Sequence, residues 1–232
     1  MNIDGLEIEV ERKPIKNMHL SVYPPDGRVH LSVPDYLTDS DVRSYVVSKL
    51  EWIHKQQKGI ANQERQTKRE YVSGENHYLF GVRYRLRVIY ITNGSNSIEI
   101  HGGIMTMRVR KCTSVERREE LVSEWYREQL KAYIGPIVDR WTQKLDEPNV
   151  SWQIKEMKTK WGSCGQKKRI LLFNLELARV PKECIEYVIV HEITHLKVKN
   201  HNKLFETLMT ERFPSWRCLR EKLNKFIVRL QY

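Results

Sequence analysis

The sequence predicts an α+β protein with a β-rich first part that carries one helix, followed by a mainly helical second part. Apolar and polar residues alternate between Gly, Pro and Asn turn signals through residues 1–35 and 71–110. Helical periodicity then dominates residues 115–145 and the stretch after Pro181. We expect residues 1–112 and 113–232 as candidate domains, and the two parts can share one core.

In the first part, short strands precede a helix. Residues 6–10 alternate, and two further runs flank a Pro-Pro-Asp-Gly turn at residues 24–27. Asp39 or Ser40 can cap a helix with an apolar stripe from Val42 to Ile53. The polar stretch 55–69 is interpreted as a frayed helix or a loop, and residues 71–110 return to strands.

In the second part, a long helix is expected over residues 115–145, with a kink at Gly135-Pro136. Strands are expected at 152–157 and 169–175. A further helix is expected to begin at Pro181, which suits a first helical turn, and to end near Asn200. Two shorter helices should follow, one beginning near His201 and one after Pro214.

The helix after Pro181 carries the motif His191-Glu192-Ile193-Thr194-His195. Residues four apart lie on one helix face, so both histidines can bind one metal ion while Glu192 reaches a water on that ion. A catalytic zinc takes three protein ligands, and His201 is the candidate for the third. From composition, an accidental HExxH is expected about 0.03 times in this chain. The alternative is an amphipathic helix with two solvated or core histidines.

The segment Trp161-Gly162-Ser163-Cys164 lies between the two expected strands. Gly162 and the following Gly165 indicate a turn or a close backbone approach. An exposed strand edge beside a metal cleft can bind an extended peptide, so these four residues are candidate substrate-binding residues. The alternative is an ordinary hairpin with a buried Trp.

The chain resembles the YgjP-like metallopeptidase family, which contains predicted metal-dependent hydrolases. The resemblance rests on the run 161–164, the HExxH motif at 191–195, and Asn174, Pro181, His201 and Phe205. The resemblance extends over most of the chain, and more distantly the pattern is similar to SprT/Spartan-like proteases. It implies a zincin-like fold, His191, His195 and His201 as zinc ligands, and Glu192 as the catalytic base. Ile193-Thr194 replaces the more usual Leu-Ala inside the motif.

The predicted function is therefore a zinc metallopeptidase that acts on a protein or peptide with a metal-activated water. Asn174 and Glu206 are candidates for orienting the ligand imidazoles, and Tyr187 is a candidate for stabilising the oxyanion. Zinc suits three histidines and a water best, although nickel, cobalt or copper could occupy such a site. Substrate sequence and oligomeric state are not specified.

Composition limits the cellular setting and the partners. No apolar segment at the N-terminus indicates a signal peptide and no run is long enough to cross a membrane, so we expect a cytoplasmic protein. The four cysteines show no CxxC spacing and are interpreted as free thiols. The net charge of +11 is split between +4 in residues 1–112 and +7 in residues 113–232. Such a surface can attract nucleic acid or acidic substrates, or only aid solubility.

Two other classes of function stay open. One is a DNA-associated protease of SprT-like type, whose basic surface holds it near nucleic acid. The other is a non-catalytic, zinc-stabilised binding module, although structural zinc sites normally have four protein ligands. A hydrolase of a non-peptide amide is a further possibility, because the motif specifies attack by water but not the acyl group.

Overall fold

The computed structural model describes residues 1–3, 5–23, 26–61 and 69–226. The chain divides into two compact units, Met1–Lys68 and Arg69–Tyr232. The division therefore falls about forty residues before the boundary expected at residue 112. The physical reason is that strands of residues 76–110 share a core with the long helix that follows them.

The first unit contains a four-stranded mixed sheet in the order β1-β2-β4-β3. Its strands are β1 (Asn2–Ile3), β2 (Leu6–Lys13), β3 (His19–Tyr23) and β4 (Arg28–Pro34). β3 and β4 pair antiparallel, as the turn signal predicted, while β2 and β4 are parallel. One face of this sheet contributes Ile8, Val29, Leu31 and Val33 to a small core of its own.

Two helices complete this core where the sequence predicted one: α1 (Asp39–Val47) and α2 (Leu50–Ala61). Thr38, and neither Asp39 nor Ser40, is the N-cap of α1, because Thr38 and Asp41 form a reciprocal capping box. α1 ends at Val47, with Ser48 as its C-cap, and the apolar stripe continues on α2 through the buried Ile53.

The second unit begins with another four-stranded mixed sheet, in the order β5-β6-β8-β7. Its strands are β5 (Asn76–Leu79), β6 (Val82–Ile91), β7 (Ser97–His101) and β8 (Ile104–Arg110). β6 and β8 are parallel, and the other neighbours are antiparallel. Alternate residues such as Leu86, Met105, Met107 and Val109 are buried, so one face of the sheet belongs to the core.

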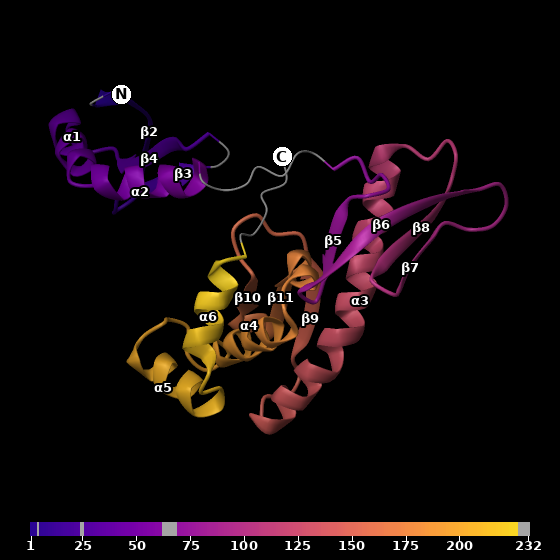
Figure 1. Ribbon diagram of the computed structural model, residues 1–232. Helices are drawn as coiled ribbons and strands as arrows, with labels where there is room; N and C mark the ends of the chain where they lie inside the picture. Colours follow the sequence, from indigo (N-terminus) through magenta and orange to yellow (C-terminus); the bar gives the residue numbers. More distant parts are fainter. Residues whose placement is uncertain (4, 24–25, 62–68, 227–232) are drawn as a thin grey trace. The chain divides into compact units, whose positions relative to one another are not determined.

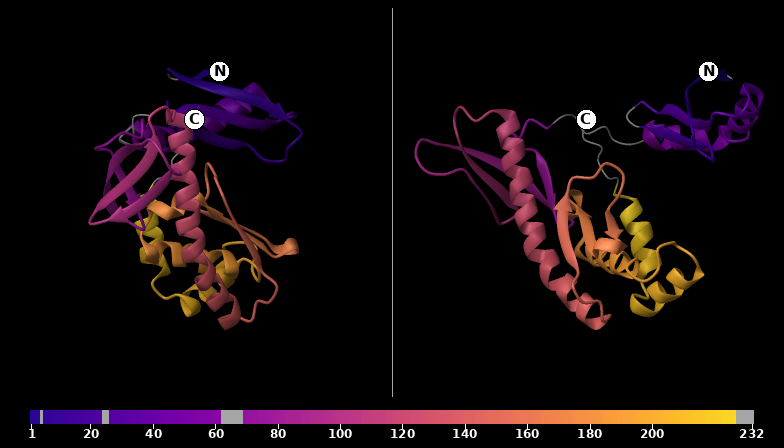
Figure 2. Two further views of the ribbon diagram at one scale, coloured as in Figure 1. Left: turned by 90° about the vertical axis from the view of Figure 1, so that its right-hand side faces the viewer. Right: turned by 180° about the vertical axis from the view of Figure 1, so that it is seen from behind.

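The long helix α3 (Val115–Lys144) connects the two halves of this unit, as Figures 1 and 2 show. It runs without interruption through Pro136. A proline disfavours helical backbone at the preceding residue by clashing with its Cβ. Gly135 has no Cβ, which lets the helix continue at this point.

A three-stranded sheet in the order β10-β11-β9 lies further along α3. It consists of β9 (Ser151–Lys155), β10 (Gly162–Gly165) and β11 (Ile170–Asn174), with the 3-10 turns η1 (Gln166–Lys168) and η2 (Leu175–Arg179). β11 is parallel to β9 and antiparallel to β10. β10 is therefore an edge strand.

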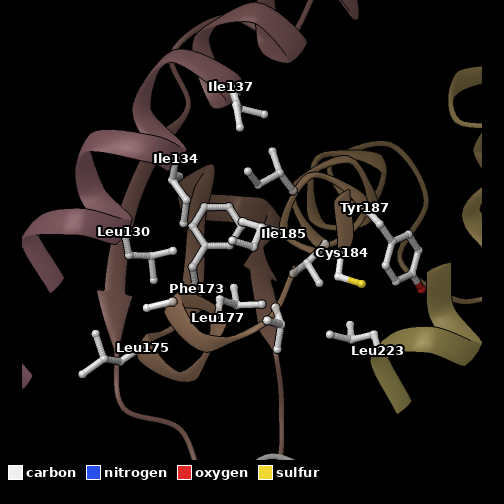
Figure 3. Packing of buried hydrophobic residues seen from close by; sticks show 14 of the residues in the cluster. Leu130, Ile134, Ile137, Phe173, Leu175, Leu177, Cys184, Ile185, Tyr187 and Leu223 are labelled. Atoms are coloured by element: carbon white, nitrogen blue, oxygen red, sulfur yellow. The ribbon is translucent and has the colours of Figure 1, made fainter. Parts of the chain in front are cut away.

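The chain ends with three helices: α4 (Lys182–Thr194), α5 (Lys203–Arg212) and α6 (Trp216–Asn224). Figure 3 shows Ile134 of α3, Phe173 of β11 and Ile185 of α4 meeting in the core, with Tyr187 facing α6. Within the described residues no helix is long and apolar enough to cross a membrane. The predicted α+β class, with its β-rich N-terminal part, is confirmed.

Candidate metal centre

α4 carries the motif, and its start is held by a hairpin from the neighbouring sheet. Pro181 is its N-cap, and the backbone N–H groups of Phe80 and Gly81 donate to the carbonyls of Ala178 and Arg179. A Cβ on Gly81 would lie 2.9 Å from Cγ of Pro181, and Gly81 has φ +82°. Only glycine permits both this backbone conformation and this close approach.

The three predicted histidines converge. The Nε2 atom of His191 lies 3.2 Å from that of His195 and 3.0 Å from that of His201. The Nε2 atoms of His195 and His201 are 3.1 Å apart. Among the described residues, this group contains three side chains of the ligating kinds and no fourth.

This donor set fits a zinc ion. Tetrahedral zinc with bonds of about 2.0–2.1 Å to imidazole holds neighbouring ligand nitrogens about 3.3 Å apart. The observed separations of 3.0–3.2 Å are close to that value. Three imidazole nitrogens facing one point offer lone pairs to a cation, and a fourth position is left for water.

Phe205 of α5 supports all three imidazoles. Its ring centroid is 5.0 Å from that of His191, 4.6 Å from that of His195 and 4.8 Å from that of His201. The side chain of Asn202 accepts a hydrogen bond from the backbone N–H of Phe205, which caps α5 at its start. Phe205 therefore fixes ring orientation by packing.

The segment 195–201 that joins the second and third histidines, here called the metal loop, is held at several points. α4 ends at Thr194, earlier than the expected end near Asn200, and His195 is its C-cap. The carbonyl of Val198 lies 3.0 Å from Nδ1 of His195, and Gln166 donates to the carbonyl of His195 at 2.5 Å. A carbonyl partner at Nδ1 directs Nε2 toward the metal.

A buried carboxylate also anchors the metal loop. Glu147 is 5% exposed and pairs with Arg169 at 2.7 Å and with Lys197 of the loop at 3.6 Å. Lys197 also donates to the carbonyl of Leu145 at 3.4 Å. The loop is thereby tied to the segment that follows α3.

His191 and His195 are held in their neutral form, which metal binding requires. Burial, together with the neighbouring charges of His195, His201 and Arg220, lowers the pKa of His191 to about 3. Burial also lowers the pKa of His195, while its hydrogen bond to Val198 opposes this shift.

Glu192 follows His191 on α4 and is 5% exposed. Burial raises the pKa of its carboxyl to about 8, against a smaller opposing effect of Lys160. Gly162 of β10 lies directly against this carboxyl, and a Cβ there would be 2.7 Å from Oε1. The glycine predicted to mark a close approach therefore makes room for the Glu192 carboxyl.

The predicted substrate segment lies on the edge strand. Gly162, Ser163 and Cys164 belong to β10, and Trp161 precedes it, with its carbonyl accepting from the backbone N–H of Asn174. Burial raises the pKa of the Cys164 thiol to about 11, so it is protonated at neutral pH. Cys164 is absent from the cluster of candidate ligands among the described residues.

The other predicted site residues have partners away from the imidazoles. Nδ2 of Asn174 donates to the carbonyls of Met157 and Lys160, both at 2.7 Å, and so holds the loop before β10. Glu206 pairs with Arg217 at 3.3 Å on the protein surface. Their roles in orienting the ligands remain predictions.

Tyr187 contacts His191, and Arg220 acts on His191 through its charge. The ring of Tyr187 lies 5.8 Å from that of His191, and burial raises the pKa of Tyr187 to about 12. The charge of Arg220, on α6, lowers the pKa of both Tyr187 and His191. Sequence reasoning missed Arg220, Gln166 and Glu147, because no spacing in the sequence links them to the motif.

In a comparison with known protein families, residues 16–226 match the family described as "YgjP-like, metallopeptidase domain". The chain belongs to the YgjP-like family. The resemblance inferred from the sequence is thus confirmed, and the family is one of metal-dependent hydrolases. No curated protein matched significantly.

Two solved structures are similar to parts of this YgjP-like protein. The metallopeptidase zymogen jannalysin of Methanocaldococcus jannaschii is 28% identical, with a TM-score of 0.37, over 40% of this chain and 94% of that one. The metallopeptidase zymogen abylysin of Pyrococcus abyssi is 17% identical, with a TM-score of 0.38, over 42% of this chain and 97% of that one.

Proposed function

We propose that this protein is a zinc-dependent metallopeptidase that hydrolyses peptide bonds, with His191, His195 and His201 as ligands and Glu192 as general base. The observation that carries the proposal is the convergence of three Nε2 atoms within 3.0–3.2 Å, two of them from the helix that also carries the buried Glu192. Family membership supports metal-dependent hydrolysis.

A zinc ion bound here would polarise the substrate carbonyl and lower the pKa of a bound water to about 7. The residues of the chain would do the remaining work. A cation held by the histidines favours the ionised form of the neighbouring Glu192 carboxyl. Glu192 can then take the proton of the attacking water and deliver it to the leaving nitrogen. Its low exposure keeps the carboxyl out of bulk water, and Gly162 keeps space open beside it.

The edge strand β10 supports a peptide as substrate. An extended peptide can add to a free strand edge through main-chain hydrogen bonds. β10 pairs with β11 on one side only, and its Gly162 contacts Glu192. A peptide that extends this sheet would therefore bring its carbonyl groups next to the general base.

Tyr187 and Arg220 are the two candidates for stabilising the oxyanion. A protonated phenol and a guanidinium both donate hydrogen bonds to a developing negative charge. Arg220 forms no ion pair within the described residues, so its charge is available to a substrate. Measuring kcat for Tyr187→Phe and for Arg220→Gln shows which of the two side chains is the donor. Loss of the donor should lower kcat by about 100-fold, and loss of the other side chain should not.

A structural zinc module is the competing function. Such sites close all four positions with protein ligands, often cysteine. The candidate centre has three histidines, and Cys164 is protonated and outside the ligand cluster of the described residues. These observations support a catalytic site with a position left for water.

The test compares peptide cleavage by the wild type and Glu192→Gln after removal of metal and reconstitution with one equivalent of zinc. Glutamine keeps the shape of Glu192 but cannot take a proton. We expect both proteins to bind one zinc and only the wild type to cleave a peptide library.

Glu221→Gln is the matched control, because Glu221 is an exposed glutamate on α6. It should cleave like the wild type. Equal cleavage by wild type and Glu192→Gln would exclude Glu192 as the base. Failure of the wild type to bind zinc would reject the proposed function as a whole.

A further inference from the structure

The net positive charge of this protein comes entirely from its second unit. Residues 1–68 contain 10 Lys and Arg against 10 Asp and Glu. Residues 69–232 contain 30 basic and 19 acidic residues, and so carry the whole net charge of +11. Part of this excess is concentrated on one sheet.

The register of the β5–β8 sheet places five arginines on the face opposite the core. Leu86 pairs with Met105 and Val88 with Met107 on the core face. The alternate positions are Arg83, Arg85 and Arg87 on β6 and Arg108 and Arg110 on β8. We call these five residues the arginine row.

The arginine row crosses from one strand to the next. The β8 residues Arg108 and Arg110 lie opposite Ile89 and Ile91, which continue β6 beyond Arg87. Neighbouring arginines on one strand are about 6.6 Å apart, and the row extends about 26 Å along the sheet. It is therefore a linear array of guanidinium groups.

Negative charge is scarce on this face. Glu99 of β7, paired with Arg108 at 2.5 Å, is the one acidic residue in the strands β5–β8. Arg83, Arg85, Arg87 and Arg110 are exposed and form no ion pair among the residues that the structure describes. Such a row repels itself unless a polyanion neutralises it.

Apolar side chains alternate with the charges. Ile89, Ile91 and Ile104 share the face with the arginine row, and Tyr78 of β5 lies opposite Arg83. In Figures 1 and 2, α3 lies on the other face of this sheet. An open sheet face with cations and apolar groups can bind phosphates and unstacked bases together.

We propose that the outer face of the β5–β8 sheet binds single-stranded nucleic acid through the arginine row. A nucleic acid carries one phosphate at every nucleotide, which matches a regular row, and guanidinium binds phosphate in a bidentate manner. A broad sheet does not enter the grooves of a duplex, whereas a single strand can lie flat on it.

The experiment is fluorescence anisotropy of the full chain with labelled dT30, a 30-base-pair duplex of the same length, and dT30 with polyglutamate as competitor. Five phosphate contacts predict a slope of about −3.5 for log K against log salt. The triple variant Arg83→Gln, Arg85→Gln, Arg87→Gln should have a slope of about −1.4 and bind at least about 10-fold more weakly.

The matched control removes three exposed positive charges elsewhere in the same unit, by Lys131→Gln, Lys155→Gln and Lys225→Gln. It should bind dT30 nearly as the wild type does. Glu99→Gln should bind more tightly than the wild type, because it frees Arg108, and a misfolded protein could not give this gain.

Four results would overturn the proposal: no binding of dT30 at 50 mM salt, equal weakening by both triple variants, equal affinity for the duplex, or competition by polyglutamate as strong as that by dT30 of equal charge. The last would indicate an acidic protein as partner. Glu192→Gln should bind dT30 like the wild type, so this test is independent of peptidase activity.

Discussion

At the scale of single residues, the contact between Gly162 and Glu192 links the edge strand to the candidate general base. A Cβ on Gly162 would lie 2.7 Å from Oε1, 2.8 Å from Cγ and 3.0 Å from Cδ of Glu192. The sequence showed both residues, but their contact depends on how β10 packs on α4. A spacing rule within the motif therefore could not reveal it.

Gly162→Ala tests this contact. The added methyl group must displace the Glu192 carboxyl, and misplacing a reacting group by about 1 Å can cost about 100-fold in rate. We expect kcat for peptide cleavage to fall by about 10-fold to 100-fold while one zinc remains bound. Unchanged kcat would mean that the position of Glu192 does not depend on Gly162.

The raised pKa of Glu192 also affects how the stability of the metal-free protein depends on pH. The folded pKa of Glu192 is about 8, above the ordinary 4.5, so the folded state holds a proton that the unfolded state loses. Stability therefore falls as pH rises through this window. His191, with its pKa lowered to about 3, has the opposite effect, but only below its ordinary pKa of 6.5.

Between pH 6.5 and 8, the free energy of unfolding of the metal-free wild type should fall by about 2 kcal/mol relative to Glu192→Gln. Urea unfolding at both pH values measures the difference. Parallel pH profiles for the two proteins would show that Glu192 is not held protonated by burial.

At the scale of elements, the metal loop presents the third histidine. The sequence predicted His201 from the need for a third ligand, but it placed the end of the helix near Asn200. In the structure α4 ends at Thr194. The loop after this early end is held by the side chains of Gln166 and Glu147, which lie far from the motif in sequence.

Lys197→Met tests the anchor of the metal loop. It removes the ammonium that pairs with Glu147 and bonds to the carbonyl of Leu145. Because Lys197 is half exposed, we expect a modest loss of about 5-fold in zinc affinity, measured by competition with a chelator.

Lys199→Met is the matched control, since Lys199 lies on the same loop and forms no ion pair within the described parts of the chain. Its zinc affinity should stay at the wild-type value. The anchor would be refuted by equal zinc affinities of the two variants.

At the scale of the whole molecule, the chain has two separate hydrophobic cores. One lies within residues 1–68, and the other joins the β5–β8 sheet, α3 and the motif helix. Periodicity identified most strands and helices correctly. It could not assign the β5–β8 sheet to the second unit, because pairing between distant segments leaves no local pattern in the sequence.

Two fragments distinguish the observed division from the expected one. Residues 69–232 keep the larger core intact and should fold and bind one zinc like the full chain. Residues 113–232 lack Leu86, Met105, Met107 and Val109, which cover α3, and should fail to fold. Circular dichroism and bound zinc provide the readout, and a folded 113–232 fragment would favour the boundary at residue 112.

The proposed centre holds zinc with three histidines and leaves one position for water. X-ray absorption at the zinc edge of the reconstituted full chain measures this coordination. We predict three nitrogen neighbours and one oxygen at about 2.0–2.1 Å. A sulfur neighbour at about 2.3 Å, or a fourth protein ligand, would exclude this coordination and indicate a closed, structural site.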